Sequence, residues 1–283
     1  MSIVFTISRL TFYEASRRKV LLAAVGLGLL FLIIYGIGFH YLISDLEQNI
    51  GISNRLQLNE IRNFLLTAGM FVIHFLASIM TVLISADTLS GEISSGTIQT
   101  IVTKPVRRWE ILSGKWLGFA VMLTFYLLLM AGGVMLIVFV RTGYTAPHPL
   151  RAIALLWLNL LLLLSISLLG GTTFSTLTNG VIILGLYGIA FIGGWIEQIG
   201  SYMSDISTSQ IARNIGVVTS LIMPSEALWR RAVHEIQSPL VAAIGFSPFT
   251  SAYYPSLAMV IYAACYTIAA FAFAIVLFKR RDL

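Results

Sequence analysis

The chain has 283 residues, of which 58% are hydrophobic and 11% are charged. An average soluble domain has roughly 25% charged residues, far more than this chain. The low charge content and a mean hydropathy of +0.90 together exclude a soluble globular enzyme and a disordered chain. This composition predicts an all-α polytopic membrane protein. The formal net charge is +6, but basic residues flank apolar runs rather than forming a continuous patch, and we expect no nucleic-acid partner. Its one cysteine, Cys265, excludes an internal disulfide framework and a zinc site built from cysteines.

Residues 2–19 precede the first apolar run and are basic. They contain Arg9, Arg17, Arg18 and Lys19. We expect a short helix along the cytoplasmic interface, although its amphipathic pattern is imperfect. The alternative is a basic flank of the kind that precedes many first spans.

Six apolar runs are long enough, or nearly so, to cross a bilayer, which takes about 20 residues in a helix. We place them at 20–43, 64–86, 117–140, 152–169, 181–199 and 257–278. Backbone groups in lipid need internal partners, so each run is expected to be a helix. The runs are continuous rather than alternating, which excludes a transmembrane β-barrel. We interpret residues 1–283 as a single transmembrane domain.

Charge predicts the orientation of these spans. If both termini are cytoplasmic, the inner segments are 1–19, 87–116, 170–180 and 279–283, with eleven Lys and Arg against five acids. The outer segments contain seven basic and seven acidic residues. The whole positive excess therefore lies on one side, as the positive-inside rule requires.

Residues 87–116 form an inner loop of about 30 residues, longer than most connections between helices. A break is predicted at 94–97, where Ser, Ser, Gly and Thr follow one another. Ile98, Ile101 and Val102 then share a face of a very short helix. This helix ends at Lys104, because a residue before proline is pushed out of the helical region.

A second helix is expected from Pro105 into the third span, with Val106, Trp109 and Trp116 on one face. The two pieces would form an apolar-faced elbow on the cytoplasmic side. An apolar face on a protruding elbow favours a protein partner. The alternative is a helix that lies flat on the lipid surface.

Residues 200–256 form a second segment outside the spans, on the outer side of the membrane. Residues 211–223 and 240–254 are moderately apolar, but a proline ends the first stretch and another interrupts the second. Both are too short or too broken to span. We expect extracytoplasmic or re-entrant helices that cap the bundle.

A search for catalytic chemistry yields no constellation. His234-Glu235 begins like HExxH, but Ser238 stands where the second histidine is needed. His74 lies inside the second span, where we favour a lone neutral histidine hydrogen-bonded to a neighbouring helix over a functional site. The P-loop pattern GxxxxGK[ST] is absent, so we expect no ATP hydrolysis by this chain.

Three motifs stand out in the inner loop and the start of the third span. They are, in order, Glu92 with Gly96-Thr97-Ile98, the run Lys104-Pro105-Val106-Arg107-Arg108, and the stretch Glu110-Ile111-Leu112-Ser113-Gly114-Lys115-Trp116-Leu117-Gly118. Together they resemble the cytoplasmic loop of permeases in the type-2 exporter superfamily of ATP-binding-cassette (ABC) transporters. The resemblance covers the whole chain, from the interfacial N-terminal helix through six spans to the basic C-terminus.

This resemblance implies that the inner loop docks on a separate cytoplasmic nucleotide-binding ATPase subunit. The residues implied at this interface are Glu92, Gly96, Thr97, Ile98, Ile101, Val102, Lys104, Pro105, Arg107, Arg108, Glu110 and Lys115. Glu92 is similar to the acidic residue that contacts the ATPase or holds the elbow in family members. The uncharged turn after the fourth span resembles a second, smaller contact with Thr176, Thr178 and Asn179.

The resemblance also implies a function, namely the permease subunit of an ATP-driven exporter in the inner (plasma) membrane. Two permeases, identical or paralogous, would pair with two ATPase subunits in membrane lipid, with the substrate path at the permease interface. ATP and Mg²⁺ would bind the partner, and this chain would have no catalytic, cofactor or metal residue. Two alternatives stay open. One is a membrane scaffold or assembly factor that recruits a cytoplasmic partner, and the other is an intramembrane enzyme, for which the sequence offers no titratable cluster.

Overall fold

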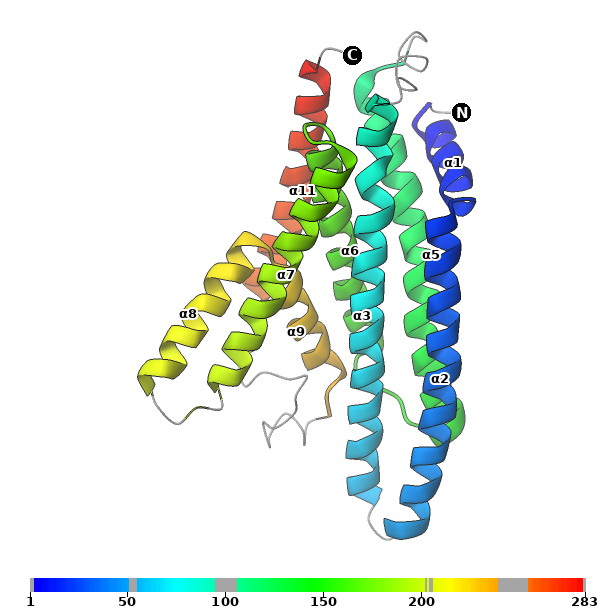
Figure 1. Cartoon of the computed structure of the whole chain (residues 1–283). Helices are drawn as coiled ribbons and strands as arrows, with labels where there is room; N and C mark the ends of the chain where they lie inside the picture. The colour runs from blue at the N-terminus through cyan, green and yellow to red at the C-terminus, as the bar shows by residue number, and fades with distance from the viewer. Residues whose placement is uncertain are drawn as a thin grey trace.

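The computed structural model describes residues 3–50, 55–94, 106–201, 203, 206–238 and 254–281, and all regular structure in these ranges is α-helical. The helices are α1 (Ile3–Ser16), α2 (Lys19–Ile50), α3 (Arg55–Ser94), α5 (Arg108–Thr142), α6 (Pro149–Gly171), α7 (Thr176–Ser201), α8 (Ile206–Ile222), α9 (Ser225–Ile236) and α11 (Leu257–Arg280) (Figure 1). Six helices in the described ranges are long and apolar enough to cross a membrane, namely α2, α3, α5, α6, α7 and α11. The predicted all-α polytopic fold is confirmed.

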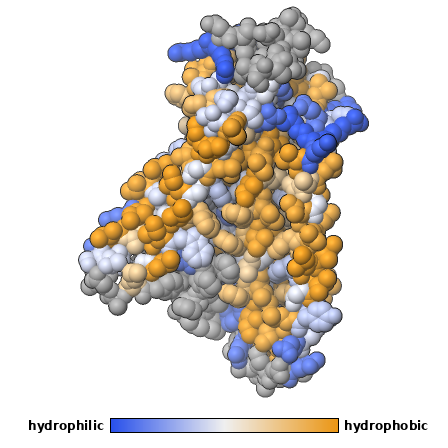
Figure 2. Space-filling model, viewed as in Figure 1, coloured by the Kyte–Doolittle hydropathy of each residue, from blue (hydrophilic) through white to orange (hydrophobic). Residues whose placement is uncertain are grey.

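The centre of the bundle is formed by α3 and α6. In the most apolar stretch of each helix, the share of residues buried inside the protein is 67% for α6 and 61% for α3. It is only 11% for α2, which lies at the periphery. Figure 2 shows hydrophobic side chains over the middle of the molecule and hydrophilic ones towards its two ends. Such a surface suits a body that is surrounded by lipid and has polar groups at both membrane faces.

The longest helix, α3, has 40 residues, so at 1.5 Å per residue it is about 60 Å long and exceeds a bilayer core of about 30 Å. It continues through Asp87 and Glu92 to Ser94, where the sequence predicts a break. The connection to α5 is therefore shorter than the predicted loop 87–116. The predicted short helix with Ile98 and Ile101 lies outside the described residues.

One end of the bundle, here called the inner end, gathers the described parts of the segments that the charge count places inside. It contains α1, the end of α3 at Ser94, the start of α5 at Arg108, the turn 172–175 and the end of α11. Both chain termini lie there as well (Figure 1). The predicted common side of these segments agrees with this arrangement.

The segment 200–256 contains two described helices. The first stretch forms α8, which packs antiparallel on α7 and, with it, runs obliquely away from the other spans (Figure 1). The sequence interpretation missed α9, a charged helix that packs against α6. Its ion pair between Arg230 and Glu197 of α7 is 2.6 Å long, with both side chains at least nine-tenths buried. The predicted stretch 240–254 lies almost wholly outside the described residues.

The interpretation of His74 as a hydrogen-bonded histidine is wrong. Its ring is 3% exposed and stacks on Trp229 of α9, with centroids 5.0 Å apart. Neither ring nitrogen has a hydrogen-bond partner among the described residues. An aromatic neighbour, rather than a polar one, therefore holds this ring where α3 meets α9.

Candidate coupling site

A buried ion pair joins the two helices that come before and after residues 95–107. The Glu92 carboxylate, in the last turn of α3, accepts a hydrogen bond from the Lys115 ammonium near the start of α5. Only 5% of the Lys115 side chain and 14% of the Glu92 side chain are exposed. Breaking a buried pair by removing one partner is strongly destabilising, because the remaining charge is left uncompensated. The pair therefore fixes α3 to α5 at the base of the loop.

Two glycines of α5 bring α1 against the same region. A Cβ atom added to Gly114 would lie 2.6 Å from the Cβ of Ile7, and one added to Gly118 would lie 2.7 Å from the carbonyl oxygen of Ser8. Small residues four apart allow helices to approach closely. The N-terminal helix therefore lies in a groove of α5, one turn from Lys115.

A second set of contacts ties the junction of α1 and α2 to α3 and α7. The Arg18 guanidinium lies 3.1 Å from Asp87 and 2.8 Å from Glu14. The Thr176 hydroxyl donates to Asp87 over 3.2 Å and lies 2.9 Å from the Ser90 hydroxyl. Asp87 is half exposed, so its ion pair stabilises less than the buried one, as is usual for surface pairs.

The two neighbouring arginines at the start of α5 have different surroundings. Arg108 donates to the carbonyl oxygens of Phe278 (3.3 Å) and Lys279 (3.2 Å) and to that of Arg281. A cation is favourable there, because the last carbonyls of a helix lack intrahelical partners. Arg108 therefore caps α11, whereas the side chain of Arg107 is exposed.

Glu110 has a local role at the start of α5. Its carboxylate accepts a hydrogen bond from the backbone N–H of Arg107 over 2.8 Å. This is the return half of a capping box, and an acid in the first turn also complements the helix dipole. The arrangement fixes where α5 begins, three residues after Pro105.

The expected apolar face of the second helix is mostly directed into the molecule. Val106 and Trp116 pack against the hydrophobic core, and the indole N–H of Trp116 donates to the hydroxyl of Ser165 on α6 over 3.0 Å. Trp109 remains 36% exposed. Of the three residues, only Trp109 presents a sizeable apolar surface to a partner.

The sequence of the whole chain was compared with known proteins. A sequence model for the family described as "ABC-2 family transporter protein" matches residues 2–283. The chain belongs to the ABC-2 transporter family. No curated protein matches it in sequence. The protein is therefore a multi-pass membrane permease of an ABC-2 type transporter, as the inner-loop motifs suggest.

The predicted interface residues of this ABC-2 permease fall into three groups. Glu92, Arg107, Arg108, Glu110 and Lys115 are brought together around the ends of α3 and α5. The others from the loop lie outside the described residues, namely Gly96, Thr97, Ile98, Ile101, Val102, Lys104 and Pro105.

The third group is the predicted second contact after α6. Thr178 is exposed and lies 2.9 Å from the Ser175 hydroxyl, while Thr176 is turned towards Asp87. Asn179 is fully buried and donates to the carbonyl oxygens of Ser167 and Ala86 over 2.9 and 3.3 Å. In this structure its amide joins helices and is not at the surface.

Sequence reasoning missed the contribution of Arg18, Asp87 and Arg281. Arg281 donates to the carbonyl oxygen of Thr172, which ties the end of α11 to the turn between α6 and α7. All three were counted only as charges for the orientation of the spans. A signal did exist, because a charged residue directly at the end of an apolar run often pairs with another at the same depth.

Proposed function

We propose that this permease is driven by ATP hydrolysis on a separate nucleotide-binding subunit, which docks at the inner end around the connection between α3 and α5. One observation carries the proposal, the buried pair of Glu92 and Lys115. If the ends of α3 and α5 were not joined, the connecting segment could change shape when a partner moves, and the helices would stay in place. Because the ion pair holds the two helix ends together, a movement of the connecting segment displaces both helices.

The helices joined by this ion pair are long enough to transmit movement across a membrane. α3 has 40 residues and α5 has 35. Other contacts join α3 and α5 to their neighbours. Gly114 and Gly118 pack α5 against α1, the ion pair of Arg18 with Asp87 joins α3 to the start of α2, and Arg108 joins α5 to α11. Displacement of the loop would therefore shift five helices at the inner end, which is a rigid-body mode of conformational change.

The proposal includes the orientation and the location of the chain. Both termini would be cytoplasmic in the inner (plasma) membrane, which the positive charge of the segments at the inner end supports. The permease itself would be non-catalytic. ATP and Mg²⁺ would bind to the partner subunit, as the missing P-loop pattern in this sequence suggests.

A second permease copy, or a paralogue, would complete the transporter, with the substrate path between the two. Exposed isoleucines along one side of α7 support a partner in the membrane: Ile189 is 51% exposed, Ile192 59% and Ile196 37%. Contiguous apolar surface of this kind meets either lipid or another protein.

Affinity purification of the full chain from its native host in mild detergent tests the proposal. It predicts a stoichiometric soluble partner with a P-loop, whose vanadate-sensitive ATPase activity changes when Glu92 or Lys115 is substituted. A partner without nucleotide-dependent change would instead indicate a membrane scaffold. A preparation without any ATPase, under conditions that keep other membrane complexes intact, would contradict the proposal.

A further inference from the structure

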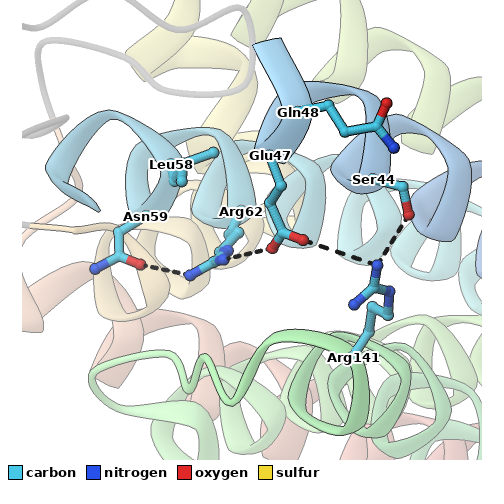
Figure 3. A pocket seen from close by; sticks show the side chains of 7 residues that line it. All are labelled: Ser44, Glu47, Gln48, Leu58, Asn59, Arg62 and Arg141. Carbon is cyan, nitrogen blue, oxygen red and sulfur yellow. Dashed lines mark hydrogen bonds and ion pairs between the residues drawn. The ribbon is translucent and has the colours of Figure 1, made fainter. Parts of the chain in front are cut away.

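A polar pocket of about 730 Å³ opens at the end of the bundle opposite the coupling site, between the outer ends of α2, α3 and α5 (Figure 3). We call it the outer pocket. Its lining residues are Ser44, Glu47, Gln48, Leu58, Asn59, Arg62 and Arg141. The volume is in the range of small-molecule sites, roughly 300–1,000 Å³. All but Leu58 offer polar groups, so the pocket suits a polar ligand or headgroup.

One carboxylate faces two guanidinium groups in the outer pocket. Glu47 projects between Arg62 and Arg141 (Figure 3), with one oxygen 3.0 Å from Arg62 and the other 3.8 Å from Arg141. Only the first distance is that of a hydrogen bond. The charged lining residues therefore carry one positive charge in excess, and the ion pair of Arg141 with Glu47 is the longer of the two.

The other contacts of the two arginines are neutral. Arg62 donates to the side-chain oxygen of Asn59 over 3.1 Å, and its Nε is buried without a hydrogen-bond partner among the described residues. Arg141 donates to Nδ1 of His40 over 3.0 Å and to the Ser44 hydroxyl over 2.9 Å. Each guanidinium has five N–H donors in a fork that matches carboxylate and phosphate. The pocket thus has donors and positive charge beyond what its own acceptors use.

The outer pocket lies where the apolar runs end. The runs of α2 and α5 end at Ile43 and Val140, one residue before Ser44 and Arg141, and that of α3 begins two residues after Arg62. This is the level at which lipid headgroups meet water. Anionic headgroups pair with arginines at this depth through charge-assisted hydrogen bonds.

We propose that the outer pocket binds a phosphate group, either that of an anionic phospholipid headgroup or free phosphate, through Arg62 and Arg141. Glu47 is the internal anion with which the ligand competes. Because the two arginines stand on α3 and α5, a bound phosphate bridges the outer ends of the same two helices that Glu92 and Lys115 join at the inner end. The alternative is that Glu47, Arg62 and Arg141 bind no ligand and only hold α2, α3 and α5 together.

Native mass spectrometry of the full chain in a neutral detergent tests this site without any ATPase. Phosphatidylglycerol and phosphatidylcholine with the same acyl chains are compared, and the wild-type protein should retain the anionic lipid about tenfold better, as expected for one or two charge-assisted bonds. Arg141→Gln should lose this preference. The matched control is Arg151→Gln, at the outer end of α6 and 68% exposed, which should keep it.

Glu47→Gln separates a ligand site from a structural cluster. Removing the competing carboxylate should raise retention of the anionic lipid, whereas a purely structural cluster would only be weakened. Inorganic phosphate identifies the source: displacement of the lipid at millimolar concentration indicates a site for any phosphate, and no displacement indicates a lipid headgroup site. Equal retention of both lipids by the wild-type protein, unchanged preference in Arg141→Gln, or weaker retention in Glu47→Gln would overturn the proposal.

Discussion

The carboxylate of Glu92 at the end of α3 pairs with the ammonium of Lys115 near the start of α5, and the pair is almost completely buried. The chain leaves α3 and returns to α5 between these two residues. A force on the connecting loop therefore acts on both helices together. This relationship gives Glu92 and Lys115 a structural role that does not depend on direct contact with a partner.

The pair should be essential for the stability of the inner end. Lys115→Met should destabilise the protein by about 3 kcal/mol, because it removes the ammonium that compensates the Glu92 carboxylate. The double variant Glu92→Gln/Lys115→Met removes both charges and should recover most of the loss. Thermal unfolding of the purified chain in detergent measures both. A wild-type melting temperature for Lys115→Met alone would show that the pair stabilises nothing.

The groove for α1 is tested by two glycines of the same helix. Gly118→Ala should destabilise the protein by about 1–3 kcal/mol through overpacking and loosen α1, because the new methyl group would lie 2.7 Å from the Ser8 carbonyl oxygen. Gly132→Ala is the control, since apart from its own chain neighbours and helix backbone no described atom lies within 4 Å of its added Cβ. Hydrogen exchange of residues 3–16 should accelerate in the first variant only. Equal exchange in both would contradict the close packing.

Arg107 and Arg108 should behave differently although they are neighbours in sequence. Arg108→Gln should fray the end of α11, because it weakens the capping of three carbonyl groups. Arg107→Gln keeps the hydrogen bond from the backbone N–H of residue 107 to the Glu110 carboxylate. It should therefore leave α11 intact. Hydrogen exchange over residues 275–281 distinguishes them. Fraying in both variants, or in neither, would show that the capping contact does not hold α11.

The orientation of the chain can be read with single cysteines in a Cys265→Ala background. Thr173→Cys places a thiol in the exposed turn between α6 and α7, and Gln210→Cys places one on the exposed surface of α8. On intact cells, a membrane-impermeant thiol reagent should label position 210 and leave position 173 unlabelled until the membrane is opened. Labelling at 173 alone would invert the proposed topology.

The spans could be predicted because a bilayer imposes one requirement on composition and length, and the six apolar runs meet it. Their ends could not, since helices continue past the apolar stretch wherever charged residues find partners. α3 runs through Asp87 and Glu92 for this reason. The break predicted at 94–97 from local capping and glycine chemistry falls almost wholly outside the described residues and stays a prediction.

Contacts between residues that are far apart in the chain could not be predicted from the sequence. The helix α9 was missed because its charged composition resembles an exposed loop, yet Glu197 of α7 accompanies Arg230 into the interior. Periodicity likewise placed Trp116 on a face for a partner, whereas its indole reaches Ser165 on α6. Pairing of this kind depends on how helices cross, which periodicity within one helix does not contain.

The most direct test of the account is a charge swap at the base of the loop. Co-purification of the ATPase and its vanadate-sensitive activity would be compared for the wild-type chain, Glu92→Lys, Lys115→Glu and the double swap. Each single variant should lose coupling, because two like charges then face each other, and the double swap should regain much of it. Full coupling in the single variants, or none in a double swap that folds as stably as the wild-type protein, would contradict the claim that this pair transmits the movement.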